Sequence, residues 1–316
     1  MNGLGLIKRK ISAAKEIAVS GHVNPDGDSI GSLLSLGLGL ESLNKRVQML
    51  SVDGVPQKYT GLPGAKRIVT KITRPADLAI TVDCSNKEIL GSAYGMLKGA
   101  KDILEIDHHE FRRPFGNIKY IEPKAAAVGE LIYRLLKKLN INITNDIAQN
   151  LLTSVIVETD SFRLPNVSQF TFEVSAELIK SGVDFYRLVN TVFWATRKES
   201  AVLAGICLSR CKFLKANRIV WSIIRQSDFR KIRGKDEDVD AVADQMRAIK
   251  DVEIAVLLRE KKKGLLRVSL RSKDKVNIAQ IAEYYGGGGH FDVAGCTIPD
   301  NPKIIRQLLA MAKKLL

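Results

Sequence analysis

Three short, mostly apolar segments in the first third of the chain each lead into acidic or imidazole side chains. The segments, with the polar residues that follow them, are residues 17–20 with His22, Asp26 and Asp28, residues 78–82 with Asp83, and residues 102–106 with Asp107, His108 and His109. Apolar runs of this length between turn residues are typical of buried strands. Strands that alternate with helical segments predict an α/β fold with a doubly wound, mainly parallel sheet. Because parallel strands end at one edge of a sheet, we expect these side chains to converge there.

The first of these polar stretches, residues 21–29, predicts a tight loop between a strand and a helix. Asn24, Pro25 and Gly27 are turn formers that make the backbone double back. His22, Asp26 and Asp28 can then meet at one point, as ligands of a divalent metal ion do. The alternative is an ordinary loop in which Asp28 or Ser29 caps the helix expected at residues 30–43.

Length and charge indicate two domains and an anionic partner. The 316 residues carry 49 Lys and Arg against 34 Asp and Glu, a surplus of 15 that favours nucleic acid or nucleotide. A basic solubilising surface is the alternative. Four scattered cysteines suit a reducing compartment, and no apolar run approaches the roughly 18 residues of a membrane span. We therefore expect a cytoplasmic protein that does not insert into a membrane.

We expect a larger α/β domain at residues 1–186, a linker at 187–199 and a smaller α/β domain at 200–316. Within the second domain the pattern predicts helices at 200–215, 238–250, 277–285 and 303–316, and strands at 218–224, 252–258, 265–270 and 293–298. Four glycines and His290 separate the third helix from the last strand. Arg259 and Lys261–Lys263 are expected to form a solvated basic hairpin.

All four histidines of the chain fall in these polar stretches, which favours a two-metal hydrolytic site over ordinary histidine packing. A pair of divalent ions about 3.5–4 Å apart needs several protein ligands, including a bridging carboxylate. The candidates are His22, Asp26, Asp28, Asp83, Asp107, His108, His109 and Asp160. Carboxylates with a few imidazoles suit Mn²⁺ or Mg²⁺. Hydrolysis of a phosphoester or phosphoanhydride is the reaction that such a site predicts.

The whole motif set, from His22-x-x-x-Asp26-x-Asp28 through Asp107-His108-His109 to Gly-Gly-Gly-Gly-His290, resembles the DHH phosphoesterase superfamily. The resemblance covers nearly the whole chain and is strongest to the nanoRNase and 3′-phosphoadenosine 5′-phosphate phosphatase branch. It implies that one ion is bound by His22, Asp26 and Asp83, and that the second is bound by Asp28, Asp83, His108 and Asp160. It also implies that Asp107 orients the imidazoles and that His109 faces the substrate phosphate or leaving group.

The C-terminal domain resembles the DHH-associated substrate-binding domain. The resemblance implies that Gly287, Gly288 and Gly289 let the backbone approach a nucleotide, and that His290, Arg271 and Ser272 contact phosphate. A homodimer and an active site in the cleft between the two domains are likewise implied. One departure concerns the fourth motif, where many relatives have Thr-Gly between the aspartate and an aromatic residue. With Asp160 as that aspartate, this loop is shorter.

The expected activity is metal-dependent hydrolysis of short oligonucleotides and of 3′-phosphoadenosine 5′-phosphate. Soluble cyclic-dinucleotide phosphodiesterases and RecJ-type single-strand exonucleases are the alternatives within the superfamily. The alternative from another class is a nucleic-acid-binding protein that has lost catalysis. The presence of every expected ligand argues against that alternative.

Overall fold

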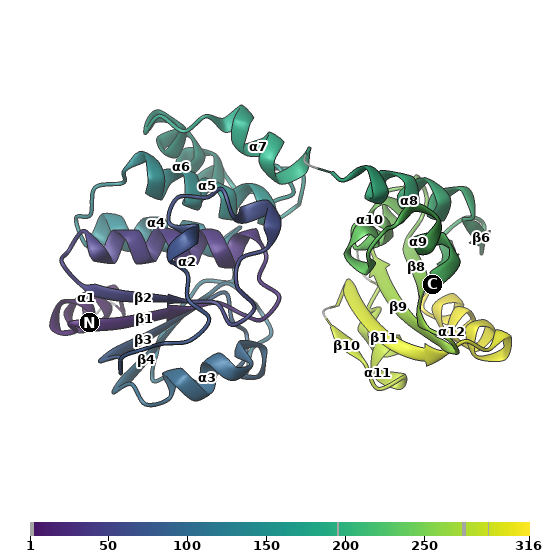
Figure 1. Cartoon of the computed structure of the whole chain (residues 1–316), viewed down its shortest axis with the longest axis horizontal. Helices are drawn as coiled ribbons and strands as arrows, with labels where there is room; N and C mark the ends of the chain where they lie inside the picture. Colours follow the sequence, from purple (N-terminus) through teal and green to yellow (C-terminus); the bar gives the residue numbers. More distant parts are fainter. Residues whose placement is uncertain (1–2, 195, 274–275, 290) are drawn as a thin grey trace. The chain divides into compact units, whose positions relative to one another are not determined.

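The computed structural model describes residues 3–194, 196–273, 276–289 and 291–316. The chain forms two compact units, residues 1–195 and residues 196–316 (Figure 1). Each unit has its own sheet and its own apolar core. The expected α/β class is confirmed.

Unit 1 is built on a five-stranded sheet with the order β2-β1-β3-β4-β5, and all its strand pairs are parallel. The strands are β1 (Glu16–Ser20), β2 (Arg46–Leu50), β3 (Leu78–Val82), β4 (Asp102–Asp107) and β5 (Ile118–Ile121). The three strands that precede the polar stretches, β1, β3 and β4, are neighbours. Their carboxyl ends therefore lie side by side at one edge of the sheet.

Helices cover both faces of this sheet. The helical elements of unit 1 are α1 (Gly3–Ala13), α2 (Gly27–Glu41), η1 (Gln57–Tyr59), η2 (Ala65–Arg67), η3 (Glu88–Leu90), α3 (Ser92–Leu97), α4 (Val128–Lys138), α5 (Asn145–Glu158), α6 (Gln169–Lys180) and α7 (Phe185–Phe193). Helices α2, α4 and α5 lie over one face and α3 lies under the other (Figure 1). The larger core includes side chains of α2, α4 and α5, and a smaller one includes Leu90, Ala93 and Leu97 beneath the sheet.

Helices α2 and α5 approach each other closely because small residues lie between them. A Cβ atom placed on Gly31 of α2 would lie 2.4 Å from the backbone oxygen of Asn150 in α5. Caps fix where the two helices begin: Asp26 accepts a hydrogen bond from the Ser29 amide before α2, and Thr144 accepts one from the Ile147 amide before α5. The close packing brings the end of α5 beside the start of α2.

Unit 2 contains a mixed six-stranded sheet with the order β10-β11-β9-β8-β7-β6, in which only β7 and β8 are parallel. Its strands are β6 (Lys212–Leu214), β7 (Ile219–Ile224), β8 (Ile254–Lys262), β9 (Leu265–Ser272), β10 (Gly288–Gly289) and β11 (Val293–Pro299). Its helical elements are α8 (Lys198–Ser209), α9 (Gln226–Ile232), η4 (Asp236–Val239), α10 (Val242–Arg247), α11 (Ala279–Tyr284) and α12 (Pro302–Lys314). Two apolar clusters form its core, one with α8, α9 and α10 and one with α11 and α12.

Two helices of unit 2 are shorter than their sequence pattern predicts. The expected helix at 200–215 ends at Ser209, and Lys212–Leu214 instead forms the edge strand β6, which pairs with β7. The Lys212 ammonium group lies 5.3 Å from the centre of the Trp221 ring on that neighbouring strand. The expected helix at 238–250 is divided into η4 and α10. The helix at 200–215 ends early because residues 212–214 pair with β7, and local sequence periodicity does not predict such pairing.

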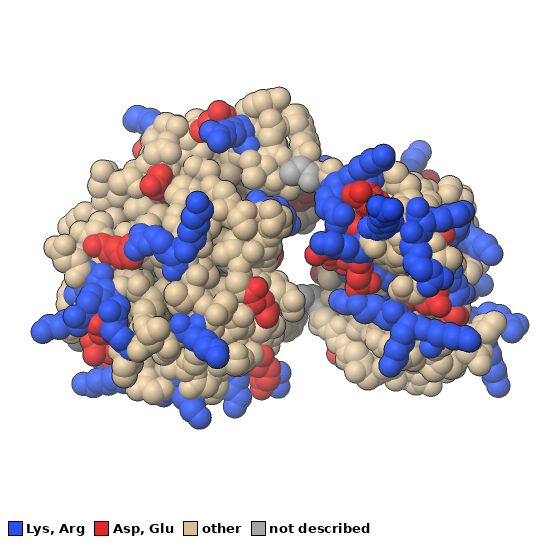
Figure 2. Space-filling model, in the orientation of Figure 1, with Lys and Arg blue, Asp and Glu red and all other residues tan. Residues whose placement is uncertain are grey.

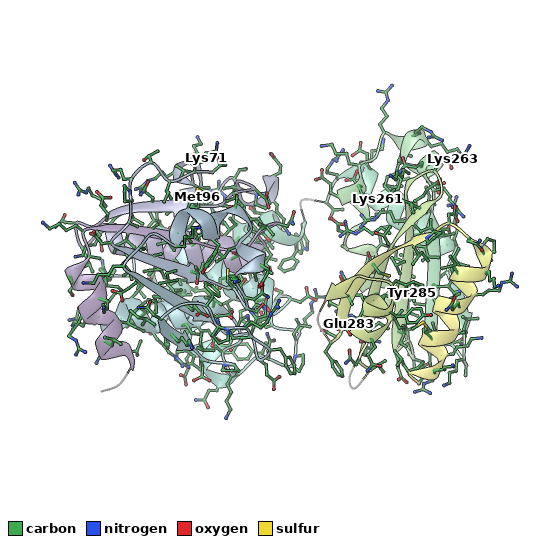
Figure 3. The ribbon with its side chains drawn as sticks, turned by 90° about the horizontal axis from the view of Figure 1, so that it is seen from below. Lys71, Met96, Lys261, Lys263, Glu283 and Tyr285 are labelled. Carbon is green, nitrogen blue, oxygen red and sulfur yellow. The ribbon has the colours of Figure 1, made fainter. Side chains whose placement is uncertain are left out.

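The prediction that Arg259 belongs to a solvated hairpin is wrong. Strand β8 continues to Lys262, and the Arg259 side chain is fully buried. Its Nη1 atom donates hydrogen bonds to Asp240 Oδ1 (2.9 Å) and to the backbone oxygen of Asp236 (2.6 Å). These contacts compensate for the burial of the charge. Lys261 and Lys263 are exposed along the β8–β9 hairpin, as expected (Figure 3).

Most of the net positive charge belongs to unit 2. Residues 196–316 carry 25 Lys and Arg against 14 Asp and Glu, whereas residues 1–195 carry 24 against 20. Figure 2 shows basic side chains gathered over much of the visible face of unit 2. An anionic partner is therefore attracted mainly by unit 2.

Candidate metal centre

The loop after β1 carries the first ligands of the candidate centre. His22 Nε2 lies 3.8 Å from Asp26 Oδ1 and 3.4 Å from Asp83 Oδ2. Asp26 is the residue that caps α2, and neither Asp28 nor Ser29 is the cap. Burial lowers the pKa of His22, but hydrogen bonds to Asp26 and Asp83 outweigh it and raise the pKa to about 11. A divalent ion would replace that proton.

Asp28 is fully buried in the first turn of α2. Its carboxylate accepts hydrogen bonds from Ser154 Oγ (2.5 Å), Ser32 Oγ (3.1 Å) and the Val128 amide (2.9 Å). Burial, followed by the nearby Asp83 charge, raises the pKa of Asp28 to about 7. A carboxylate that is buried beside others in this way is stabilised by a bound cation.

His108 faces the same point from the end of β4. Its Nδ1 atom makes a 3.0 Å hydrogen bond to the backbone oxygen of Ala125. That bond directs Nε2 toward the acids, 3.7 Å from Asp28 Oδ2 and 3.8 Å from Asp83 Oδ1. A backbone carbonyl partner on one ring nitrogen is the usual way in which a metal-binding histidine is oriented.

Asp83 lies between His22 on one side and His108 on the other. It follows β3 directly, is buried, and has a left-handed backbone with φ of 58°. Ligand atoms of His22, Asp26 and Asp83 lie within 4.8 Å of one another, and so do those of Asp83, His108 and His109. Asp83 is thus common to two triads, as a carboxylate that bridges two ions must be.

Glu158, the last residue of α5, is a member of this cluster that the sequence analysis missed. Its Oε1 atom lies 3.8 Å from His108 Nε2. Burial and the charges of Asp28, Asp83 and Asp26 raise the pKa of Glu158 to about 9. Ser154, which binds Asp28, is four residues earlier in the same helix, so the two side chains share a helix face. That spacing is the sequence signal by which Glu158 could have been found.

Asp160 is placed differently from its neighbour two residues earlier. It lies beyond the end of α5, its side chain is 45% exposed, and Oδ1 accepts a hydrogen bond from Arg163 Nη2 (2.7 Å). Among the described residues, no contact joins Asp160 to the histidines or to the other aspartates of the cluster. Asp160 has a φ of 47°, and Ser161 and Phe162 are also left-handed. Thr159 directly follows Glu158, which is the order that the resemblance predicts after the fourth-motif acid.

Asp107 is hydrogen-bonded to both histidines that follow it in the chain. Oδ1 accepts hydrogen bonds from His109 Nδ1 (2.7 Å) and from the His108 amide (2.9 Å), and Oδ2 accepts one from Arg112 Nε (2.6 Å). Burial raises the pKa of Asp107, but the hydrogen bond from His109 and the positive charges around it outweigh burial and lower the pKa. The arrangement holds Nδ1 of His109 against Asp107.

The substrate-binding residues expected in unit 2 lie on β9 and near β10. Arg271 Nε donates to Asp244 Oδ1 (2.9 Å), and the buried Ser272 donates from Oγ to the backbone oxygen of Val276 (2.6 Å). A Cβ atom on Gly287 would lie 2.2 Å from the backbone oxygen of Gly295, so only glycine fits there.

The glycine-rich segment continues through β10. Gly288 and Gly289 form this short strand, and Gly289 has a φ of 149°. Such a backbone conformation is one that L-amino acids other than glycine rarely adopt. His290 lies outside the described residues.

The cluster in unit 1 has the chemistry of a divalent-metal centre. Four carboxylates and two or three imidazoles converge at the edge of the sheet. Burial first, and then the charges of neighbouring acids, raise the pKa values of Asp28 and Glu158. Oxygen ligands with a minority of imidazole nitrogens suit Mn²⁺ or Mg²⁺. The residues present therefore fit a bound divalent ion.

Comparison with known proteins identifies two domains in the chain. Residues 16–157 match the DHH family, N-terminal domain, and residues 220–316 match the DHHA1 domain. The chain thus contains a DHH domain followed by a DHHA1 domain. Among individual proteins, it is 28% identical to the bifunctional oligoribonuclease and PAP phosphatase NrnA of Thermus thermophilus, over 89% of this chain and 84% of that protein.

Solved structures share the fold over nearly the whole chain. A crystal structure of an exopolyphosphatase-related protein from Bacteroides fragilis has a TM-score of 0.92 at 23% identity, covering 98% of this chain and 95% of that one. A crystal structure of exonuclease RecJ bound to manganese has a TM-score of 0.61 at 13% identity, covering 98% and 91%. At these identities the two structures establish the fold and no more.

None of the helices in the described part of the chain is long and apolar enough to cross a membrane. The four cysteines are free, and Cys84, Cys207 and Cys296 are buried.

Proposed function

We propose that this protein is a metal-dependent phosphoesterase that hydrolyses short oligonucleotides and 3′-phosphoadenosine 5′-phosphate. The observation that carries the proposal is the position of Asp83, which belongs to two groups of ligand atoms at the ends of neighbouring parallel strands. The name of the Thermus thermophilus relative, an oligoribonuclease and PAP phosphatase, supports the choice of substrate.

The proposal includes two divalent ions, with Mn²⁺ as the physiological metal and Mg²⁺ as the alternative. His22, Asp26 and Asp83 would hold one ion, and Asp28, Asp83, His108 and Glu158 would hold the other. Glu158 replaces Asp160 in this set because its carboxylate lies beside His108, whereas Asp160 is paired with Arg163. When bound, the ions supply an activated water and neutralise charge on the phosphate.

The protein's own side chains would then orient the substrate and move a proton. Asp107 holds Nδ1 of His109, so Nε2 of that ring is the atom that faces the substrate phosphate or the leaving oxygen. In unit 2, Arg271, Ser272, the three glycines and His290 would bind substrate phosphate, because exposed amides of a glycine loop and an arginine fork both suit anions. Arg271 would exchange its contact with Asp244 for the phosphate.

Four further expectations belong to this proposal. The first is a catalytic domain at residues 1–186 and a substrate-binding domain at residues 200–316, joined through residues 187–199. The protein is a homodimer, which light scattering on the purified protein tests. It acts in the cytoplasm, which suits its free cysteines. It binds nucleotides or oligonucleotides and no membrane.

The test is a hydrolysis assay with Mn²⁺, using the wild-type protein and Asp83→Ala. The substrates are an RNA ladder from dinucleotides upward, 3′-phosphoadenosine 5′-phosphate, cyclic-di-AMP and pyrophosphate. Loss of two- to five-mers and of the bisphosphate, abolished by Asp83→Ala, is expected. Cleavage of cyclic-di-AMP or pyrophosphate alone would keep the metal centre and overturn the substrate assignment. Nucleotide binding without turnover on any substrate would refute the enzyme.

A further inference from the structure

Arg112 is buried in a loop whose neighbouring side chains are exposed. The loop follows β4, and within it the side chain of Arg113 is 75% exposed and Phe111 is 77% exposed. The Arg112 side chain is only 7% exposed. Burying a guanidinium group is costly unless charged partners compensate for the lost water. The charged partners of Arg112 therefore indicate the role of this buried side chain.

The guanidinium group joins two acids of β4. Nε donates to Asp107 Oδ2 (2.6 Å), while Nη2 donates to the Glu105 carboxylate and to the backbone oxygen of Cys84 (3.2 Å). Both carboxylates are fully buried. The planar fork of arginine fixes the orientation of such partners in a way that a lysine ammonium group does not.

The far side of this network is anchored to the backbone. Glu105 Oε1 accepts hydrogen bonds from the amides of Phe115 (2.9 Å) and Gly116. Arg112 is therefore held by a carboxylate that cannot easily rotate. The rotation of the Asp107 carboxylate is fixed in turn, with Oδ1 directed at His109 Nδ1 (2.7 Å).

We propose that Arg112 is a positioning residue for the reaction, acting on His109 through Asp107. The inference rests on the proposed function, because His109 is the group that would face the phosphate or leaving oxygen. Within the described residues, the hydrogen bonds of Arg112 go to Asp107, Glu105 and Cys84, none of which is a proposed metal ligand. The alternative role is purely structural, in which the ion pairs only fasten the loop to β4.

Steady-state kinetics on the preferred substrate separate these roles. Arg112→Lys keeps the charge and loses the fork, and Arg112→Ala removes both. The matched control is Arg113→Ala, which removes the exposed arginine next in the chain, 3.5 Å from Glu88. Loss of a partner that orients an active-site group typically costs between about 10- and 100-fold in activity. We expect kcat to fall by that factor in Arg112→Lys and Arg112→Ala, with KM little changed, and to stay at the wild-type value in Arg113→Ala.

Chemical rescue is the second kinetic readout. Guanidinium ion at millimolar concentration should restore part of the kcat of Arg112→Ala and leave Arg113→Ala unchanged, with NaCl at equal ionic strength as the control. Rescue requires that the guanidinium group itself orients Asp107. If Arg112→Ala does not fold, Arg112→Lys decides the question. Wild-type kcat in a folded Arg112→Lys variant whose only defect is a lower Tm would overturn the proposal.

A spectroscopic measurement tests the positioning without turnover. The chain has only four histidines, so ¹⁵N-histidine labelling gives few ring signals, and His109→Asn assigns the proton shared between His109 Nδ1 and Asp107. We expect Arg112→Lys to shift or broaden that signal and Arg113→Ala to leave it unchanged. If the wild-type protein is inactive but Arg112→Lys alone changes the His109 signal, the proposed function is refuted and the positioning of His109 by Arg112 is supported. An unchanged signal in Arg112→Lys would refute the positioning in an active enzyme.

Discussion

Exchanging Glu158 for glutamine should have opposite effects on the metal-free and the metal-bound protein. Without metal, burial and the charges of Asp28, Asp83 and Asp26 raise the pKa of Glu158 from 4.5 to about 9. Between these two pH values the folded protein binds a proton that the unfolded chain does not. The free energy of unfolding therefore falls as pH rises through this window. Glutamine has no such proton and removes the penalty.

The size of the penalty follows from the same window. At pH 7 the difference of 2.5 pH units from 4.5 corresponds to about 3 kcal/mol as an upper bound. About a third of the Glu158 side chain is exposed, and solvent screening reduces the figure to about 1–2 kcal/mol. We expect metal-free Glu158→Gln to be more stable by that amount. Each kcal/mol should raise Tm by about 2–4 °C in a domain of this size.

With Mn²⁺ the order should reverse, because the variant has lost an anionic ligand. A ligand should cost at least the roughly 10- to 100-fold in affinity that loss of a supporting group costs. Stabilisation by a bound ion depends on the logarithm of its concentration over its Kd. Mn²⁺ should therefore raise the Tm of Glu158→Gln less than that of the wild type.

Asp160→Asn is the matched control, since it makes the same chemical change two residues away. That side chain is half exposed and paired with Arg163, so the change should alter stability by less than about 0.5 kcal/mol and leave Mn²⁺ affinity unchanged. Calorimetric unfolding with and without EDTA, together with titration of Mn²⁺, measures both quantities. Wild-type Mn²⁺ affinity in Glu158→Gln, or weakened affinity in Asp160→Asn, would refute the assignment of Glu158.

Three further predictions follow from the packing and from the charges. Gly31→Ala should lower the free energy of unfolding in urea by about 1–3 kcal/mol, because its Cβ would meet the Asn150 backbone. Gly95 has no atom within 4 Å of such a Cβ, so Gly95→Ala should be neutral or slightly stabilising. Equal effects of the two substitutions would contradict the packing. Arg259→Ala should destabilise unit 2 by about 1.5–3 kcal/mol through lost charged hydrogen bonds, and an unchanged urea midpoint would exclude this role. His22, with a metal-free pKa of about 11, must release its proton to bind an ion. The affinity for Mn²⁺ should therefore fall from pH 8 to pH 6, and the heat of binding should depend on the ionisation enthalpy of the buffer. A heat of binding that is the same in all buffers would argue against His22 as a ligand.

Much of unit 1 could be predicted from the sequence because two local signals agree there. Strand β3 is a fully buried run that Asp83 follows directly, whereas β4 carries two acids among its apolar residues and ends on Asp107. Parallel pairing then requires those ends to meet, whatever the connecting loops do. The convergence of His22, Asp83 and His108 is therefore a property of the sheet, and it could be inferred without any knowledge of side-chain contacts.

The elements that the sequence did not predict depend on partners far away in the chain. Strand β5 has only four residues, of which Ile118 alone is buried, and it is defined by its pairing with β4. Arg259 stands beside three lysines, which favoured a solvated segment, yet Asp240 and the backbone of Asp236 lie over it. The sequence holds the charges but not the pairing, and pairing decides whether a basic side chain is buried or exposed.

Glu158, the fourth acid of the proposed metal centre, shows that the period of the helix must be considered together with the spacing of the motif. Ser154 of α5 faces the centre because its hydroxyl group donates to Asp28. The residue four positions later must face the same way, and that residue is Glu158. Asp160 is six positions later, beyond the end of the helix, where three consecutive left-handed residues turn the chain aside. The phase of the helix therefore selects Glu158, and the placement of Asp160 follows from where α5 ends.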